Sequence, residues 1–294
     1  MRIAAAPVSW GLCEVPGWGY QMPGARVLHE MERLGIRATE LGPPGFLPES
    51  GPALRTLLAE HDLSPVGAFA PIVLHDATVD AVAQAKPFIQ RLRACGADVL
   101  VIGAATGRDG YDGRSTLDRE QWDRLVANLE HVEKVAQDSD VRAVLHPHMG
   151  TVIERREEVY QLLGSCSVPL CLDTGHLLIG GTDPLELLRT HGDRIAHVQL
   201  KDVTAALAAQ VSSGETRYSD AVRDGMYTPL GRGDIDIEGL LDELAARSYS
   251  GWLVLEQDRV LTEDPVGEGP LADARASIAY LRTALVRAQK ESGR

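Results

Sequence analysis

Short apolar runs recur along the chain, and most are followed by a turn and then by a longer segment with apolar residues at helical spacing. The runs are continuous rather than alternating, which is typical of parallel strands that are covered on both faces. They predict eight strands, at residues 2–10, 37–42, 64–70, 97–103, 141–148, 168–176, 194–202 and 251–258. Strands that alternate with helices in this way indicate a parallel sheet built from βαβ units.

Segments with helical periodicity lie between most of these runs. Residues 24–35 show it clearly and end at Gly35, a common stop signal for a helix. Further helices are expected at residues 77–96, 115–136, 153–164, 183–191, 236–247 and 271–289. The eightfold count of strands, without a GxGxxG motif after the first one, favours a closed (β/α)8 TIM barrel over a doubly wound sheet. Because no linker or low-complexity segment interrupts the chain, residues 1–294 are expected to form a single domain.

One connection is longer than the others. More than 30 residues separate Lys201, at the end of the seventh predicted strand, from the helix expected to begin near Asp236. Long connections in compact domains are usually functional. In a TIM barrel, the segment that follows a strand lies on the catalytic face. We therefore expect a long loop at about 203–235 beside the functional site.

Composition narrows the range of partners. The formal net charge is −13, from 42 acidic and 29 basic residues, and such a surface repels nucleic acid. The four cysteines show neither a CxxC pair nor zinc-finger spacing, which indicates reduced thiols in a cytoplasmic protein. No apolar run approaches the ~20 residues of a membrane-spanning helix, so no membrane contact is expected. The subunit count stays open, and a homo-oligomer is compatible with the sequence.

Polar residues collect where the predicted strands end. Five of the nine histidines fall at or just beyond these ends, together with several acids: His75, His146, His148, His176 and His197, with Glu40, Asp173, Asp202 and Glu256. The carboxyl ends of the strands in a barrel meet at one mouth, so these side chains are expected to gather there. Each residue alone is more often structural than functional. Together they need a compensating centre, which a divalent metal supplies.

Side-chain parity selects a set of ligands. Successive strand residues point to opposite faces, so His146 and His148 share a face, as do His197, Gln199 and Lys201. One residue from each of the last four strands gives the predicted ligand set, with His148 as the alternative to His146: His146, Asp173, Gln199 and Glu256. Nitrogen and oxygen ligands suit Mn²⁺ or Co²⁺ first, and also Mg²⁺, Zn²⁺ or Fe²⁺.

Several motifs resemble those of the xylose-isomerase-like TIM-barrel superfamily of sugar isomerases and epimerases. They are "HPHMGT" (146–151), "CLDTGHL" (171–177), "HVQLKDV" (197–203), "DGMYTPLGRGDID" (224–236) and "GWLVLEQD" (251–258). Within that superfamily the chain is most similar to inosose (2-keto-myo-inositol) dehydratases. The resemblance covers nearly the whole chain and implies a divalent metal at the barrel mouth. Two positions depart from it, because many members carry Glu at position 146 and His at position 199.

The resemblance also implies an activity. We expect a metal-dependent lyase that dehydrates a keto-inositol or a related keto-sugar through a metal-stabilised enediolate. The candidate proton-transfer groups are His148, His176 and Lys201. The candidate contacts to this small polyol or keto-sugar are Trp10, Glu40, His75, His197, Arg217 and Arg232.

Alternatives remain at this stage. The same metal site suits an isomerase or epimerase of a ketose, and Pro147 and Gln199 are compatible with a barrel that binds a sugar without catalysis. Lys201 is expected to have a pKa lowered by burial near a cation, to bind a substrate hydroxyl, or to form a salt bridge with Asp202. Trp10 suits a barrel plug as well as a stacking surface, and the "GRGD" segment around Arg232 suits a turn that caps the next helix as well as a phosphate site.

Overall fold

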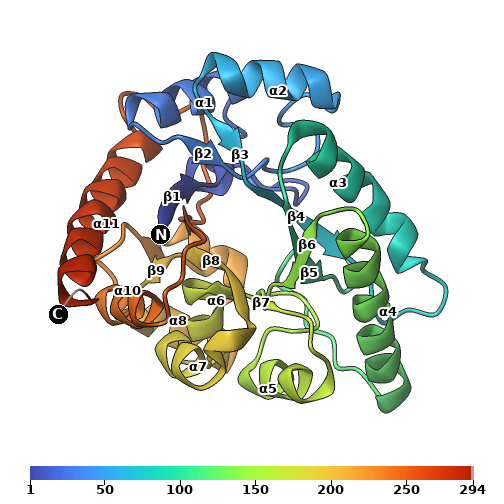
Figure 1. The fold of residues 1–294 in the computed structure, drawn as a ribbon. Coiled ribbons are helices and arrows are strands. Elements are labelled where there is room, and N and C mark those ends of the chain that lie inside the picture. Colours follow the sequence, from blue (N-terminus) through green and yellow to red (C-terminus); the bar gives the residue numbers. More distant parts are fainter. Residues whose placement is uncertain (293–294) are drawn as a thin grey trace.

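Nine parallel strands within residues 1–292, the part of the chain that the computed structural model describes, form one sheet at the centre of the molecule (Figure 1). The strands are β1 (Arg2–Ala5), β2 (Ala38–Thr39), β3 (Ser64–Pro65), β4 (Gly67–Ile72), β5 (Val99–Ala104), β6 (Arg142–Leu145), β7 (Leu170–Asp173), β8 (Ile195–Leu200) and β11 (Trp252–Leu255). Their order is β3-β2-β1-β11-β8-β7-β6-β5-β4. Each predicted apolar run therefore contains a strand.

The two ends of this sheet belong to one extended segment. Only Val66 separates β3, which pairs with β2, from β4, which pairs with β5. The backbone N–H of Val66 donates to Thr39 O at 2.9 Å, and that of Leu41 donates to Gly67 O at 2.9 Å. Residues 64–72 thus act as one strand that closes the sheet. The prediction of a (β/α)8 TIM barrel is confirmed.

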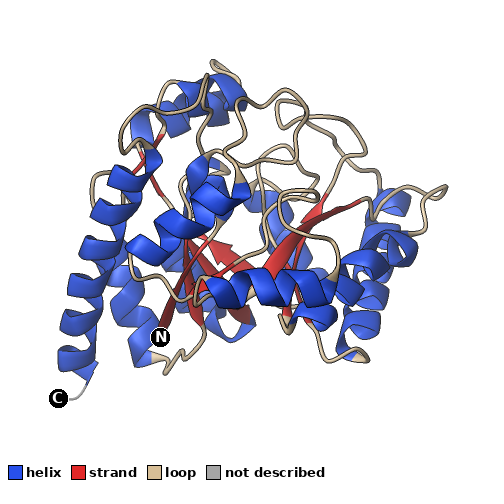
Figure 2. Cartoon of the chain, turned by 90° about the horizontal axis from the view of Figure 1, so that it is seen from above, coloured by secondary structure: helices blue, strands red, loops and turns tan. Residues whose placement is uncertain are grey.

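Helices surround the sheet, and Figure 2 shows the loops gathered on one side of it. Seven of the described helices lie where periodicity predicts them: α1 (Gly24–Arg33), α3 (Ala81–Cys95), α4 (Arg119–Gln137), α5 (Arg156–Ser165), α7 (Pro184–His191), α10 (Ile237–Ala246) and α11 (Pro270–Ser292). Four described α-helices were not predicted: α2 (Gly51–Glu60), α6 (Thr174–Ile179), α8 (Ala205–Ser213) and α9 (Tyr218–Arg223). The short 3-10 helices η1 (Pro7–Trp10) and η2 (Gly192–Arg194) complete the set. None of the described helices combines the length and the apolar character needed to cross a bilayer.

The inner face of the barrel changes character along the strands. Val144, Cys171 and Val254 are buried apolar residues. Each lies two residues before a polar residue that points to the same face, namely His146, Asp173 and Glu256. Small apolar side chains thus fill the barrel beneath a polar layer at the carboxyl ends of the strands. This layer is where the candidate site forms.

The segment at 203–235, expected to be a long loop, contains α8, α9 and a small antiparallel pair of strands, β9 (Asp202–Val203) with β10 (Tyr227–Thr228). Its last turn is fixed by the carboxylate of Asp202, which accepts backbone N–H bonds from Gly231, Gly233 and Ile235 at 2.9, 3.0 and 3.1 Å. A Cβ atom at Gly233 would overlap this carboxylate, so the turn requires glycine there. The amides of the "GRGD" segment bind the protein's own anion, which supports a turn rather than a phosphate site.

Candidate active site

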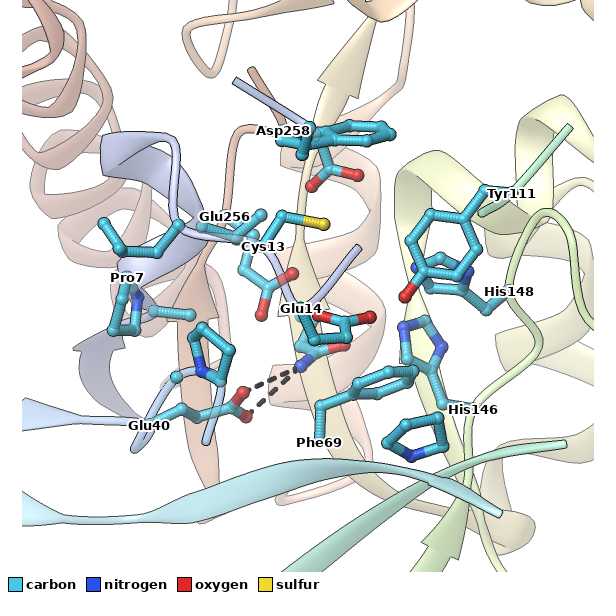
Figure 3. Close-up of a pocket in the computed structure, with 18 of the residues that line it drawn as sticks. Pro7, Cys13, Glu14, Glu40, Phe69, Tyr111, His146, His148, Glu256 and Asp258 are labelled. Atoms are coloured by element: carbon cyan, nitrogen blue, oxygen red, sulfur yellow. Dashed lines mark hydrogen bonds between the residues drawn. The ribbon is translucent and has the colours of Figure 1, made fainter. Parts of the chain in front are cut away.

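A cavity opens at the carboxyl ends of the strands, with about 730 Å³ of empty space that is partly open to solvent (Figure 3). Six of the thirteen predicted site residues line this cavity, and Asp173, His176 and His197 contact members of this set, because the parallel strands converge at this end. The polar and aromatic side chains in its wall include Glu14, Glu40, His146, His148, Gln199, Lys201, Glu256, Asp258, Phe69, Tyr111 and Tyr218.

Lys201 lies at the centre of a buried cluster of carboxylates, which we call the acid cluster: Asp173, Glu256 and Asp258. Its Nζ is 3.1 Å from Asp173 Oδ2, 3.0 Å from Glu256 Oε2 and 3.0 Å from Asp258 Oδ1. Burial alone would lower the pKa of Lys201, but the three carboxylates raise this pKa well above its ordinary value. Lys201 is therefore a fixed ammonium. The expectations of a lowered pKa and of a salt bridge with Asp202 are both wrong, because the acid cluster holds Lys201 and backbone amides hold Asp202.

Asp173 connects two elements of the site. It is the last residue of β7, and its Oδ1 accepts the backbone N–H of His176 at 2.8 Å and thereby caps α6. This contact leaves Oδ2 to face Lys201. The "DTGH" motif thus fixes the direction of both Asp173 and His176.

The acid cluster carries more negative charge than Lys201 neutralises. When all three carboxyl groups are ionised, a single ammonium leaves a net charge of −2. Burial raises the pKa of Asp173 to about 6 and the pKa of Glu256 well above its ordinary value, although Lys201 opposes both shifts. The acid cluster therefore holds either protons or a second cation.

Three histidines form the other half of the site, which we call the histidine cluster: His146, His148 and His176. All three are buried, and one ring nitrogen of each lies within 4.8 Å of the others. The rings of His148 and His176 lie in contact, with their centroids 3.7 Å apart and their planes tilted by 36°. Burial lowers the pKa of His148 to about 4 and the pKa values of His146 and His176 well below the ordinary value. The rings are therefore neutral at pH 7, which is the form that binds a metal.

Two histidine ring nitrogens face the acid cluster without forming a hydrogen bond to it. Among the described residues, His146 Nδ1 and His176 Nε2 have no hydrogen-bond partner. His146 Nε2 is 3.7 Å from Asp173 Oδ2, and His176 Nε2 is 3.6 Å from Asp258 Oδ2. Both distances are too long for a hydrogen bond. Neutral imidazole nitrogens that face excess carboxylate charge are a donor set of the kind that binds divalent metals, so the residues present fit such an ion.

Glu40 binds the two polar side chains of β8. His197 Nε2 is 2.8 Å from Glu40 Oε1, and Gln199 Nε2 donates to Glu40 Oε1 and Oε2 at 3.2 and 3.1 Å, the two dashed lines in Figure 3. The amide oxygen of Gln199 accepts a hydrogen bond from Cys171 Sγ at 3.4 Å. Gln199 therefore lies in the cavity wall with both ends of its amide engaged, and its role as a metal ligand stays a prediction.

Helix α9 covers one side of the cavity. The hydroxyl of Tyr218 donates to Asp258 Oδ2 at 2.7 Å and lies 3.0 Å from the hydroxyl of Tyr227. Asp112, in the connection after β5, accepts the backbone N–H and the hydroxyl of Ser219 at 2.8 and 2.6 Å. The insertion after β8 is thereby tied both to the acid cluster and to a neighbouring loop.

Aromatic rings complete the cover. Trp18, in the connection after β1, lies with its ring centroid 6.4 Å from that of Tyr218 and 6.1 Å from that of Tyr111. The ring of Tyr111 lies 4.5 Å from that of His148. These aromatic side chains give the outer part of the cavity an apolar surface, which suits the C–H faces of a sugar or cyclitol ring.

Five residues predicted to bind substrate lie outside the cavity wall that the described residues form: Trp10, His75, His197, Arg217 and Arg232. Trp10 is fully buried, and its Nε1 donates to Glu30 Oε2 at 2.8 Å. Arg217 is exposed and pairs with Asp220 at 3.2 Å. Their substrate contacts stay predictions without support from this arrangement. The sixth predicted contact, Glu40, lines the cavity, and His197 lies behind it as its partner in the buried pair described above.

Two acidic residues of the cavity wall were not singled out from the sequence. Asp258 follows Glu256 by two residues, so strand parity places both on one face, and this signal is visible in the sequence. Glu14 lies in the irregular connection after η1, where no periodicity indicates the direction of a side chain.

Comparison with known proteins gives consistent matches. Residues 28–284 match the family described as Xylose isomerase-like TIM barrel. The chain is 30% identical to the inosose dehydratase of Geobacillus kaustophilus, over 95% of this chain and 93% of the relative. It is 33% identical to the rhizopine catabolism protein MocC of Rhizobium meliloti, over 94% of this chain and 86% of that protein.

Solved structures share the fold at lower identity. An L-ribulose 3-epimerase superposes with a TM-score of 0.72 at 18% identity, covering 99% of this chain and 97% of the other. The IOLI protein, solved with a bound zinc atom, superposes with a TM-score of 0.67 at 15% identity, covering 99% of both chains.

Proposed function

The chain belongs to the xylose isomerase-like TIM barrel family, and we propose that it is a lyase that removes water from a keto-inositol or a related keto-sugar. The observation that carries this proposal is the convergence of three kinds of group on one cavity. A fixed ammonium, an acid cluster with excess negative charge and a set of neutral histidines all lie at the carboxyl ends of the strands. A relative of nearly the same length that is named inosose dehydratase supports the choice of substrate class.

A divalent metal is part of this proposal. The ligands that we propose are His146, Asp173 and Glu256, with Gln199 in the position that strand parity gives it. A divalent cation held there would polarise a ketone oxygen and stabilise the negative charge that forms when the adjacent carbon loses its proton. We propose Mn²⁺ or Co²⁺ from the mixed nitrogen and oxygen donors. Zinc stays in the set to be tested, because the structure of the IOLI protein holds zinc.

His148 is the residue that we propose as the base. It lines the cavity, and its Nδ1 lies 2.6 Å from the carbonyl oxygen of Met149, which fixes the proton on Nδ1 and leaves a lone pair on Nε2. That lone pair can accept a proton from the substrate carbon next to the ketone. His176 contacts the ring of His148 and lies outside the cavity wall, so we assign it to holding this ring.

Lys201 contributes a positive charge to the site and does not act as a base. Its ammonium is held by three carboxylates at 3.0 to 3.1 Å, so it donates hydrogen bonds and does not accept a proton. In this position its positive charge favours the anionic form of the deprotonated substrate. Glu40, which His197 and Gln199 hold in place, can accept hydrogen bonds from substrate hydroxyls.

The proposal is tested by incubating the metal-loaded protein with 2-keto-myo-inositol in D2O. Loss of water with accumulation of an ultraviolet-absorbing enone or dione supports a dehydratase. Deuterium uptake or a change of configuration without loss of water would instead identify an isomerase or epimerase. Binding of the substrate without any reaction would identify a barrel that only binds sugar.

A further inference from the structure

Glu14 differs from the other carboxylates in the cavity wall. Glu40 is bonded to His197, and both Glu256 and Asp258 pair with Lys201. No described residue forms an ion pair with Glu14, and its Oε1 is buried without a hydrogen-bond partner. A buried polar atom without a partner is costly in a folded protein, so it requires an explanation.

Glu14 also enters the cavity from a different direction. The other acids follow strands, whereas Glu14 belongs to the connection between η1 and α1 at the mouth of the barrel. Figure 3 shows it between the side of the cavity that carries Glu40 and Glu256 and the side that carries His146 and His148. The carboxyl group of Glu14, whose Oε1 has no hydrogen-bond partner, therefore lies beside the space that a substrate would occupy.

We propose that Glu14 is a catalytic acid that protonates the hydroxyl group leaving the substrate. The inference rests on the proposed dehydration, in which His148 removes the proton next to the ketone. The electron pair of that C–H bond first enters the enolate of the ketone. When the enolate returns to the ketone, this pair forms the new carbon–carbon double bond as the C–O bond on the next carbon breaks. Glu14 gives its proton to the departing oxygen, which leaves as water, and the proton on His148 passes to solvent while Glu14 takes up another. No oxidant or reductant is needed.

The position of Glu14 matches this role. The carbon that loses its proton and the carbon that loses its hydroxyl are neighbours, so an acid and a base on different walls of one cavity can act on them. Because Glu14 has no cation partner, it can take up and release a proton without breaking an ion pair. Burial raises its pKa to about 6, with Asp258 adding to the rise and Lys201 opposing it, so it carries a proton more often than an exposed glutamate does.

The test is Glu14→Gln in the full-length, metal-loaded protein, assayed with 2-keto-myo-inositol in D2O. We expect the rate of dehydration to fall by about 10²- to 10⁴-fold, the usual contribution of general acid catalysis. Exchange of the proton next to the ketone should continue, because His148 is intact. The KM and the bound metal should stay close to those of the wild type. Asp109→Asn, which changes an exposed acid near the same rim, is the matched control and should dehydrate at the wild-type rate.

Different results overturn different claims. A Glu14→Gln variant that dehydrates within a few-fold of the wild type overturns the role of Glu14 alone. So does a variant that fails to fold, or one that loses exchange and dehydration together, because either result indicates a structural role. A wild-type protein that does not dehydrate the substrate overturns the proposed function, and the role of Glu14 with it.

Discussion

Lys201 and Glu256 form an ion pair inside the mouth of the barrel, with Nζ 3.0 Å from Oε2 and side chains that are only 2% and 6% exposed. Buried charges persist only where they are paired, and removal of one partner is far more harmful than removal of both. Here a single ammonium serves three carboxylates. The pair therefore fixes the geometry of the site and also leaves negative charge for a second cation.

Replacement of Lys201 tests how strongly the acid cluster depends on it. Lys201→Met should lower the free energy of unfolding of the metal-free protein by about 3–5 kcal/mol, because three buried carboxyl groups lose their cation. Lys134→Met is the control, since Lys134 and its partner Asp138 are 62% and 60% exposed, and it should cost about 0–1 kcal/mol. Urea unfolding measures both values. Equal effects for the two variants would show that Lys201 is not the main counter-charge of the acid cluster.

The proposed ligands can be tested without any assay of activity. Asp173→Asn and Glu256→Gln keep the shape of each side chain but remove its charge, so each should weaken metal binding by at least about tenfold while the barrel stays folded. Calorimetric titration with Mn²⁺, Co²⁺ and Zn²⁺ measures the affinity, and circular dichroism reports the fold. His29→Ala changes an exposed histidine on α1 and should leave binding unchanged. Full metal binding by both carboxyl variants would disprove this ligand assignment.

The contact between Asp112 and Ser219 should control access to the cavity. Asp112→Ala removes two hydrogen bonds that hold α9, each worth about 1.5–3 kcal/mol for a charged acceptor. We expect cleavage within residues 205–223 to become faster in limited proteolysis. We also expect KM to rise by about tenfold with little change in kcat, since a tenfold change corresponds to about 1.4 kcal/mol. An unchanged KM together with unchanged proteolysis would show that this contact does not hold the cover in place.

Glu14 should make the stability of the protein depend on pH. Burial raises its pKa from an ordinary 4.5 to about 6, so the folded state binds this proton more tightly than the unfolded chain does. The contribution of Glu14 to stability is therefore full below pH 4.5 and is lost as the pH rises to about 6. Glu14→Gln removes this titration.

We expect Glu14→Gln to gain stability relative to the wild type as the pH rises. From pH 4.5 to pH 7, the difference in the free energy of unfolding between the variant and the wild type should shift by about 1 kcal/mol in favour of the variant. This is less than the free energy that corresponds to the full pKa shift, because Glu14 is partly exposed. Urea unfolding of both proteins at the two pH values gives this difference. Curves that stay parallel over this range would show that the pKa of Glu14 is not raised in the folded protein.

The barrel was predictable because its strands are short apolar runs with turns between them. Two of the four helices that were missed lack the signals that periodicity needs. Helix α6 has six residues and begins directly at the end of β7, so no loop separates it from the strand. Helix α8 is rich in alanine and has no clear polar stripe, so nothing distinguished it from a long loop.

Part of the site was predictable for a topological reason. Strand ends in a parallel barrel must converge, so the meeting of His146, Asp173 and Glu256 follows from the order of elements alone. The ion pairs of Lys201 do not follow from the order of elements. Several carboxylates lie within reach of Lys201, and the directions of their side chains determine which of them pair with it. Glu14 was missed for a related reason: it lies on an irregular connection, where neither parity nor helical spacing applies.

The most direct test of the proposed function is the activity of the protein on 2-keto-myo-inositol before and after removal of bound metal. The protein is stripped with a chelator, its metal content is measured, and it is then reloaded with Mn²⁺, Co²⁺ or Zn²⁺ in separate samples. We expect the stripped protein to form no ultraviolet-absorbing product and at least one reloaded sample to form it again. Undiminished dehydration by protein shown to be free of metal, or no dehydration with any of the three ions, would contradict a cation-dependent dehydratase.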